Sequence, residues 1–404
     1  MIPKHWILVV ALTCPGGPAT AQDDGIRPTP DATAFPGWIA AFRDRALAAG
    51  IAADTVDAAL DGATYQPDIV RRDRNQSEFT KTLWDYLDTA VSDLRVTNGR
   101  KALDGNASTL DAIEARHGVE KEVVVAIWGL ESSYGAFRGD VPTIPALATL
   151  AFDARRADFF EAQLLDALRI LGSGDVTAPD MTGSWAGAMG HTQFMPTSYL
   201  AHAQDFTGDG RRDIWGDDPA DALASTAAYL AAFGWTMGQP WGLEVRLPDG
   251  FDYAQTGERV ERDAADWMAD GVRAVDGGPL PVGERVSIRV PAGHLGAAFA
   301  TYPNFRVLER YNTADAYVIG VGHLSDRLAG GPPISSDWPR TDRALTFAER
   351  VELQTLLREA GFDPGKFDGL VGPNTLAAIR SYQASEGLVP DGYANPDLLA
   401  RLRG

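Results

Sequence analysis

One glutamate, Glu131, ends an apolar stretch of the chain, and such a position suits a residue that donates a proton. The preceding residues 123–130 read VVVAIWGL. At helical spacing Val123, Ile127 and Glu131 share one stripe, so we expect the carboxyl group to face the core or a cleft. Exclusion of water would disfavour its charged form and leave a protonated acid near neutral pH. The alternative is a buried structural glutamate held by an arginine or a backbone donor.

A second motif, residues 183–199, reads GSWAGAMGHTQFMPTSY and has the composition of a loop that lines a sugar cleft. Its glycines and alanines allow the backbone to approach a ligand closely. Ser184 and Gln193 supply hydrogen bonds, while Trp185 and Phe194 supply ring surface. Tight packing between a loop and a helix is the alternative explanation.

The elements that must position these motifs change character along the chain. Helical periodicity predicts helices at 37–50, 76–97, 107–117, 146–172 and 220–233. Over 241–310 apolar residues alternate as they do in half-buried strands, which predicts a small β-rich insert. Helical character resumes over 312–328. The glycines and prolines that follow predict a linker at 330–344.

The last segment, 345–404, carries start signals for three short helices. Thr346 and Glu349 form a capping box, Pro373 begins the second helix, and Asn395 caps the third. A segment of this length buries only a modest core. We therefore expect an accessory module rather than a catalytic domain.

Composition and charge limit the classes of protein that this sequence can encode. The chain has 404 residues, is 45% hydrophobic and carries a formal net charge of −19. These values predict a globular protein of two or three domains. The acidic balance argues against nucleic acid as a partner and gives no support for a polybasic membrane patch.

The N-terminal residues predict export to the periplasm. Residues 1–21 combine Lys4, a short apolar run and a final Ala-Thr-Ala, as signal peptides do, and residues 22–34 form a leader. Cys14 is the only cysteine in the sequence, so we expect no disulfide. Lipidation of Cys14 is an alternative that residues 11–13 fit poorly. We expect no membrane contact unless Cys14 carries a lipid.

Together, the stretches around Glu131 and Ser184 resemble the B family of lytic murein transglycosylases, over residues 35–329. The final segment resembles the peptidoglycan-binding domain of many cell-wall enzymes, through motifs such as Phe367-Asp368-Gly369. This resemblance implies a mainly α fold. It consists of a lysozyme-like α+β catalytic domain with a small β-rich insert, plus a small three-helix peptidoglycan-binding domain.

The reaction that this resemblance implies is cleavage of the β-1,4 bond between MurNAc and GlcNAc in peptidoglycan. Glu131 would protonate the glycosidic oxygen and then accept a proton from the C6 hydroxyl of MurNAc, giving a 1,6-anhydroMurNAc product. A hydrolytic muramidase and a non-catalytic peptidoglycan-binding scaffold are the alternatives. Peptidoglycan glycan strands are the expected partner, and proteins of cell-wall synthesis or division are left open as further partners.

The resemblance also implies which other side chains serve the site. His191 is interpreted as a lining or supporting residue rather than a general base, because the family varies at that place. The residues expected to bind the substrate are Ser184, Gln193, Phe194, Asn312, Tyr317, Tyr86 and Tyr134.

Residues 205–211, DFTGDGR, repeat the first half of a calcium-binding loop, with oxygen ligands at alternate positions and a glycine at the sharp turn. Position twelve is Gly216 instead of a glutamate, and the resemblance implies a later closing acid. A metal-free turn held by Arg–Asp pairs is the alternative. No cofactor is expected to be required, and structural calcium is left open. The candidate calcium ligands are Asp205, Thr207, Asp209, Arg211 through its carbonyl oxygen, and Asp221.

Overall fold

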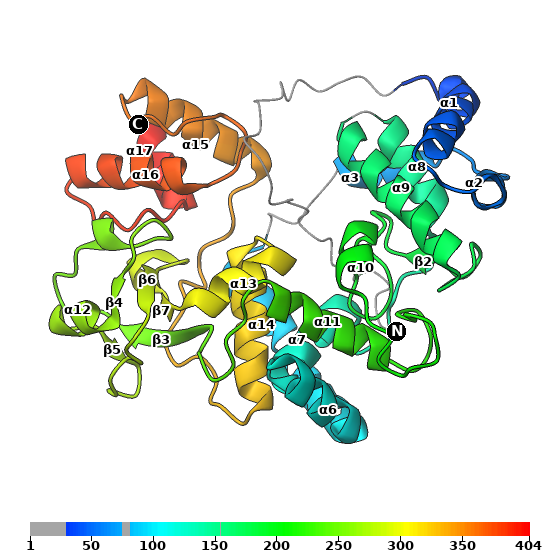
Figure 1. Cartoon of the computed structure of the whole chain (residues 1–404). Helices are drawn as coiled ribbons and strands as arrows, with labels where there is room; N and C mark the ends of the chain where they lie inside the picture. Colours follow the sequence, from blue (N-terminus) through cyan, green and yellow to red (C-terminus); the bar gives the residue numbers. More distant parts are fainter. Residues whose placement is uncertain (1–29, 75–80, 154) are drawn as a thin grey trace. The chain divides into compact units, whose positions relative to one another are not determined.

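The computed structural model describes residues 30–74, 81–153 and 155–404. Contacts divide the chain into two compact units, Met1–Gln76 with Thr97–Gly234 and Ser77–Val96 with Trp235–Gly404. Figure 1 labels most of the helices and strands of both units. The predicted signal peptide and Cys14 lie outside the described residues.

The first unit is helical, and its helix α7 (Lys121–Ser132) packs against α6 (Ala107–His117) and α11 (Ala220–Ala232). All residues of α7 from Val123 to Ser132 are buried. A helix that is apolar on nearly every side is stable only in such surroundings, and it buries Glu131 near its end. The other elements are η1 (Ala32–Ala34), α1 (Phe35–Ala48), α2 (Ala53–Leu60), α3 (Pro67–Arg74), α8 (Thr143–Phe152), α9 (Ala157–Ser173), α10 (Pro196–His202), β1 (Val141–Pro142) and β2 (Thr182–Gly183).

The short strands β1 and β2 pair antiparallel, with Val141 opposite Gly183. This pairing joins the segment that follows the turn after α7 to the start of the second motif. The two stretches that the sequence singled out are therefore connected by backbone hydrogen bonds within one unit.

The prediction of one helix over 146–172 is wrong, because α8 ends at Phe152 and α9 begins at Ala157. Asp153, at the break, is 1% exposed and accepts hydrogen bonds of 2.9 and 3.0 Å from the Arg74 guanidinium. A buried carboxylate needs such a partner, and the ion pair fixes the chain at this turn. The partner is distant in sequence, so periodicity alone could not reveal the break.

The predicted helix at 76–97 also differs from the structure. Residues 75–80 lie outside the described residues, and the rest forms α4 (Leu83–Ala90) and the first part of α5 (Asp93–Gly105). Thr82 caps α4, since its hydroxyl oxygen accepts from the backbone N–H of Asp85 at 3.3 Å.

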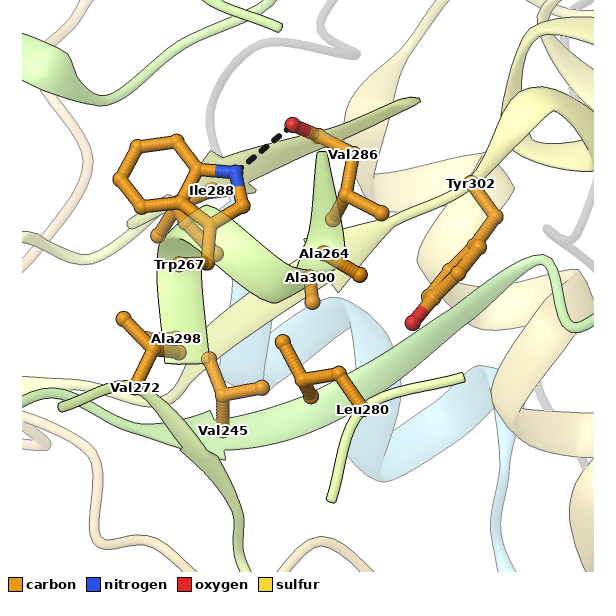
Figure 2. Close-up of a cluster of buried hydrophobic side chains, with 10 residues drawn as sticks. All are labelled: Val245, Ala264, Trp267, Val272, Leu280, Val286, Ile288, Ala298, Ala300 and Tyr302. Carbon is orange, nitrogen blue, oxygen red and sulfur yellow. Dashed lines mark hydrogen bonds between the residues drawn. The ribbon is translucent and has the colours of Figure 1, made fainter. Parts of the chain in front are cut away.

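The second unit contains a five-stranded antiparallel sheet in the order β4-β6-β7-β3-β5, as the alternating pattern of the sequence predicted. Figure 2 shows its core, in which Trp267 is fully buried and donates from its indole N–H to the carbonyl oxygen of Val286 at 2.9 Å. The strands and nearby helices are β3 (Gly242–Arg246), η3 (Tyr253–Gln255), β4 (Arg262–Asp263), α12 (Ala264–Ala269), β5 (Arg273–Ala274), β6 (Arg285–Arg289), η4 (Gly293–Leu295), β7 (Ala298–Thr301), α13 (Pro303–Tyr311) and α14 (Asp315–Leu328).

The C-terminal segment forms the three helices that its start signals predicted, α15 (Phe347–Glu359), α16 (Pro373–Ser385) and α17 (Pro396–Arg403). The capping box between Thr346 and Glu349 is present, and Asn395 accepts from the backbone N–H of Leu398. A small core holds the three helices together. Its buried members include Leu353, Leu357, Ile379, Leu398 and Leu399.

This C-terminal module contacts the sheet region within the second unit. Asp391 Oδ2 lies 2.9 Å from the backbone N and 2.6 Å from the ring Nδ1 of His294. Arg380 donates to the hydroxyl of Thr256 at 2.8 Å. Across the described residues, no helix is both long enough and apolar enough to pass through a membrane.

Candidate active site

Glu131 lies in the last turn of α7 and is 6% exposed. The sequence predicted that this carboxyl group would be removed from solvent, and the structure confirms its burial. Burial shields this carboxyl group from water at the end of an otherwise apolar helix. The arrangement suits a group that delivers a proton to a bound molecule.

The chain leaves α7 through an unusual turn. Ser133, Tyr134 and Gly135 have φ values of 51°, 61° and 83°, a left-handed region that residues with a side chain seldom adopt. Ser132 stabilises this turn because its hydroxyl oxygen accepts from the backbone N–H of Gly135 at 2.9 Å. Such backbone conformations cost free energy and persist only where the surrounding structure holds them. They are common at functional sites.

His191 joins the second motif to α7. The indole N–H of Trp128 donates to His191 Nδ1 at 3.1 Å, and His191 Nε2 lies 2.8 Å from the carbonyl oxygen of Gly216. These contacts assign the neutral tautomer with its proton on Nε2. Burial lowers the pKa of His191, as does the charge of Arg138, and both favour this neutral form.

Two glycines permit this close packing. A Cβ atom on Gly135 would lie 2.6 Å from the His191 ring, and one on Gly129 would lie 2.6 Å from the Tyr134 ring. Any side chain at either position would push an aromatic ring away. The half-buried Tyr134 also packs edge-on against Trp128, with ring centroids 5.9 Å apart.

Two polar residues of the second motif, Ser184 and Gln193, are buried and hold the loop in shape. The Ser184 hydroxyl oxygen accepts from the backbone N–H groups of Ala186 and Ala188 at 3.3 and 3.1 Å. Gln193 has a φ of 54°, and its side-chain amide donates to the carbonyl oxygens of Arg138 and Gly190 at 3.0 and 2.8 Å. Substrate binding by Ser184 and Gln193 stays a prediction.

Phe194 lies in the core of the first unit. It is 2% exposed and packs against Tyr229 with ring centroids 5.8 Å apart. The alternative explanation for the second motif, tight packing between a loop and a helix, therefore accounts for the position of this ring. Its contact with substrate stays a prediction.

The remaining predicted contacts belong to the second unit. Tyr86 lies on α4 and is half-buried, whereas Tyr317 on α14 is 2% exposed. Asn312 ends α13, is 4% exposed, and accepts at its side-chain oxygen from the backbone N–H of Ala314 at 3.0 Å. Their proposed roles remain predictions.

The calcium-like loop is held mainly by backbone hydrogen bonds to two aspartates. Asp205 accepts from the N–H groups of Gly208 and Gly210 at 2.7 and 2.9 Å. Asp221 accepts from Phe206 at 2.9 Å with one oxygen, and from Asp213 at 2.9 Å with the other. Burial raises the pKa of Asp221, although these backbone donors oppose the shift.

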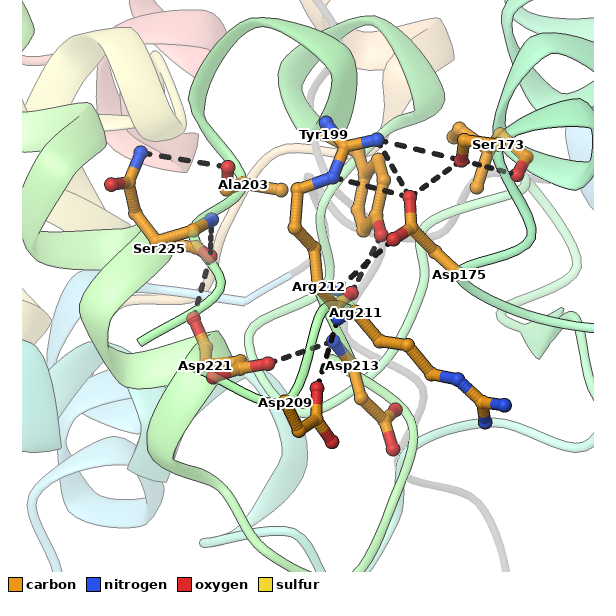
Figure 3. Close-up of polar contacts among 12 residues, drawn as sticks. Ser173, Asp175, Tyr199, Ala203, Asp209, Arg211, Arg212, Asp213, Asp221 and Ser225 are labelled. Atoms are coloured by element: carbon orange, nitrogen blue, oxygen red, sulfur yellow. Dashed lines mark hydrogen bonds and ion pairs between the residues drawn. The ribbon is translucent and has the colours of Figure 1, made fainter. Parts of the chain in front are cut away.

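An ion pair lies beside this loop, as Figure 3 shows. Arg212 donates to Asp175 Oδ2 at 2.6 Å, and its guanidinium lies over the ring of Tyr199. Calcium prefers hard oxygen donors, which this loop has. However, the described residues contain no group of three or more His, Cys, Asp or Glu side chains arranged to hold a metal ion. As folded, these hydrogen bonds shape the loop as a capped turn, and metal binding there stays a prediction.

Sequence reasoning missed the role of Arg138. Its guanidinium donates to the carbonyl oxygen of Gly216 and to Asp217 Oδ1, the latter at 3.1 Å. Its own carbonyl oxygen accepts from Gln193. Arg138 therefore ties the turn after α7 to the second motif and to the segment near Gly216. An arginine in a loop belongs to no hydrophobic periodicity, so the sequence pattern does not indicate this role.

Two family models match the chain. Residues 34–326 match the family described as the transglycosylase SLT domain, and residues 348–402 match a peptidoglycan binding domain family. The chain is 33% identical over 220 residues to membrane-bound lytic murein transglycosylase B of Escherichia coli (strain K12). That alignment covers 53% of this chain and 58% of the relative, so the match spans little more than half of the relative's length.

Solved structures extend the similarity. SltB3 from Pseudomonas aeruginosa, in complex with NAG-anhNAM-pentapeptide, is 50% identical, with a TM-score of 0.89 over 92% of this chain and 99% of that chain. SltB1 from the same organism is 30% identical, with a TM-score of 0.65 over 72% of this chain and 98% of that one. The Escherichia coli lytic transglycosylase Slt35 in complex with calcium is 28% identical, with a TM-score of 0.64 over 72% of this chain and 92% of its own.

Proposed function

Because the chain belongs to the transglycosylase SLT family, we propose that it is a lytic transglycosylase that cleaves the β-1,4 bond between MurNAc and GlcNAc in peptidoglycan. The observation that carries the proposal is the burial of Glu131 at the end of α7, 6% exposed and followed by a turn that is bonded to the second motif. The similarity to SltB3 extends over nearly the whole chain and supports the same substrate class.

Glu131 performs two proton transfers in this proposal. As an acid it gives its proton to the glycosidic oxygen, and the bond from that oxygen to C1 of MurNAc breaks. As a base it then accepts the proton of the C6 hydroxyl while that oxygen bonds to C1. The product is 1,6-anhydroMurNAc, and no water is consumed. The NAG-anhNAM-pentapeptide that SltB3 binds supports this form of product.

The supporting residues divide between holding the acid and binding the sugar. Ser132, His191 and Arg138 fix the turn that follows Glu131 through the contacts described above. We propose that the polar side chains of the second motif and of the second unit bind the glycan. These residues are Ser184, Gln193, Tyr86, Asn312 and Tyr317, and we propose that Tyr134 and Phe194 contact the glycan as well.

The product of digestion tests the reaction. Purified sacculi are incubated with the wild-type protein and with Glu131→Gln, and released muropeptides are weighed by mass spectrometry. We expect products that are lighter by one water than the reducing sugars, and no release by Glu131→Gln. Glu122→Gln, which makes the same change in the first turn of α7, is the control and should remain active. Reducing-end products would indicate a muramidase, and no release by the wild type would indicate a binding scaffold.

Two further proposals concern location. We propose that residues 1–21 direct export to the periplasm, which fractionation of cells expressing the full chain would test.

We also propose that the C-terminal module holds the enzyme on its substrate, as its peptidoglycan binding family suggests. Removal of residues 345–404 should weaken binding to sacculi and spare activity on soluble glycan strands; unaltered binding would contradict this role.

A structural calcium ion remains a proposal for the loop around Asp205 and Asp221, supported by the calcium complex of Slt35. Calcium should raise the melting temperature of the wild type, and Asp209→Ala should abolish that rise. An unchanged melting temperature would contradict the proposal.

A further inference from the structure

We propose that Phe137 is a substrate-binding residue, whose aromatic face stacks against a sugar ring of the glycan next to Glu131. This inference rests on the proposed function. Phe137 lies in the loop after α7 and is 64% exposed. Single exposed apolar residues are common on proteins, so exposure alone assigns nothing. Phe137 differs from such residues because a firmly bonded backbone carries its ring and because it lies close to the candidate acid in the chain.

The loop around Phe137 is fixed on both sides. The backbone N–H of Phe137 donates to the carbonyl oxygen of Ser132 at 2.9 Å. The next residue, Arg138, accepts from the Gln193 amide at 3.0 Å and donates to Asp217 at 3.1 Å. The exposed ring is therefore attached to a backbone that is held by several bonds. Its exposure does not come from a loose terminus or an untethered loop tip.

The same loop runs from the candidate acid to the candidate sugar-binding motif. Ser132, which bonds to Phe137, directly follows Glu131 in α7. On the other side, the backbone of Gly139 packs so closely on the motif that a Cβ there would lie 2.2 Å from the carbonyl carbon of Gly183. Phe137 stands between these two anchor points.

An aromatic ring at this place suits a pyranose. One face of a sugar ring presents C–H groups, which pack on an aromatic face, while the hydroxyl groups at the rim are left to hydrogen bond. A phenyl ring offers a large apolar surface at little cost in side-chain entropy. Stacking of this kind binds the substrate and the transition state alike, so it should lower KM and leave kcat nearly unchanged.

The test measures kcat and KM for the full-length protein on soluble, peptide-free glycan strands. Phe137→Ala should raise KM about fivefold, a factor in the range of one aromatic stacking contact, with kcat within about twofold of the wild type. Phe137→Trp should restore KM, since it returns an aromatic face. Leu94→Ala removes a similarly exposed apolar side chain, 69% exposed on α5, and should leave both constants unchanged.

The outcomes separate this inference from the proposed function. An active wild type with unchanged KM in Phe137→Ala overturns the inference alone. So does a raised KM that Phe137→Trp fails to lower, because the aromatic face would then not be the cause. A wild type that releases no product overturns the proposed function and the inference with it. Melting temperature checks folding, and all three variants should match the wild type, because exposed side chains contribute little to stability.

Discussion

The hydroxyl of Ser132 donates to the backbone carbonyl oxygen of His191 at 2.5 Å. This bond joins the residue after the candidate acid to the centre of the second motif. The same hydroxyl oxygen accepts from the backbone N–H of Gly135 and holds the left-handed turn. One side chain thus fixes both the exit of α7 and the position of the motif beside it.

Ser132→Ala should impair stability and turnover together. Both hydrogen bonds are lost at a 1% exposed position, so we expect a loss of about 1–3 kcal/mol in the free energy of unfolding. A shift of the turn would also misplace Glu131, and kcat should fall by roughly tenfold or more. Urea unfolding and turnover of glycan strands measure the two effects.

Ser133→Ala is the matched control for that variant. It makes the same change one residue later, at a half-buried position with a φ of 51°. We expect stability and kcat close to the wild type. Equal losses in both variants would show that the turn, and not the bond from Ser132 to His191, determines the effect.

Acid should destabilise the second unit through His323. This residue of α14 is 8% exposed, and burial, aided by the charge of Arg327, lowers its pKa to about 4. Because the folded-state pKa lies below the ordinary value of 6.5, the contribution is fully present above pH 6.5 and is lost as pH falls toward 4. The full loss is on the order of 3 kcal/mol.

Comparison with His323→Gln isolates that contribution. Urea unfolding between pH 7.5 and 4.5 should show a shallower loss of stability for the variant, since glutamine does not titrate there. Other buried groups titrate in both proteins and cancel in the difference. Parallel curves for the two proteins would refute the assignment to His323.

The sequence predicted those structural features that depend on residues close together in the chain. The capping box at Thr346 needs only Glu349, three residues away, and the helix began where that signal placed it. Glu131 could be recognised as buried because the run before it is apolar on nearly all sides. The alternating pattern of the insert likewise gave strands β3 and β6.

Contacts between residues that are far apart in the sequence could not be predicted from such local patterns. The break after α8 depends on Asp153 pairing with Arg74, and the tautomer of His191 depends on Trp128 and Gly216. None of these pairs has a characteristic spacing. Similarly, the motif around Phe194 is rich in sugar-binding residue types, but only the tertiary packing reveals that this ring is 2% exposed.

His294→Ala should loosen the C-terminal module from the sheet region. Asp391 is 5% exposed, and although burial raises its pKa, hydrogen bonds from the His294 ring, the backbone and Gln383 outweigh burial and lower it. Loss of the ring leaves a buried carboxylate with fewer donors. We expect this to cost about 1.5–3 kcal/mol of local stability, and to speed hydrogen exchange at residues 383–393 by about tenfold or more.

The exposed contact between Arg259 and Asn374, at 3.1 Å, provides the control. Asn374→Ala removes an interfacial bond that water can replace, so exchange at residues 383–393 should stay within about twofold of the wild type. Since the lowered pKa of Asp391 makes its charged form the stabilising one, the attachment should hold at neutral pH and weaken only as pH falls through that pKa, below the ordinary 3.8. Equal exchange in His294→Ala and the wild type would mean that the buried pair does not hold the module.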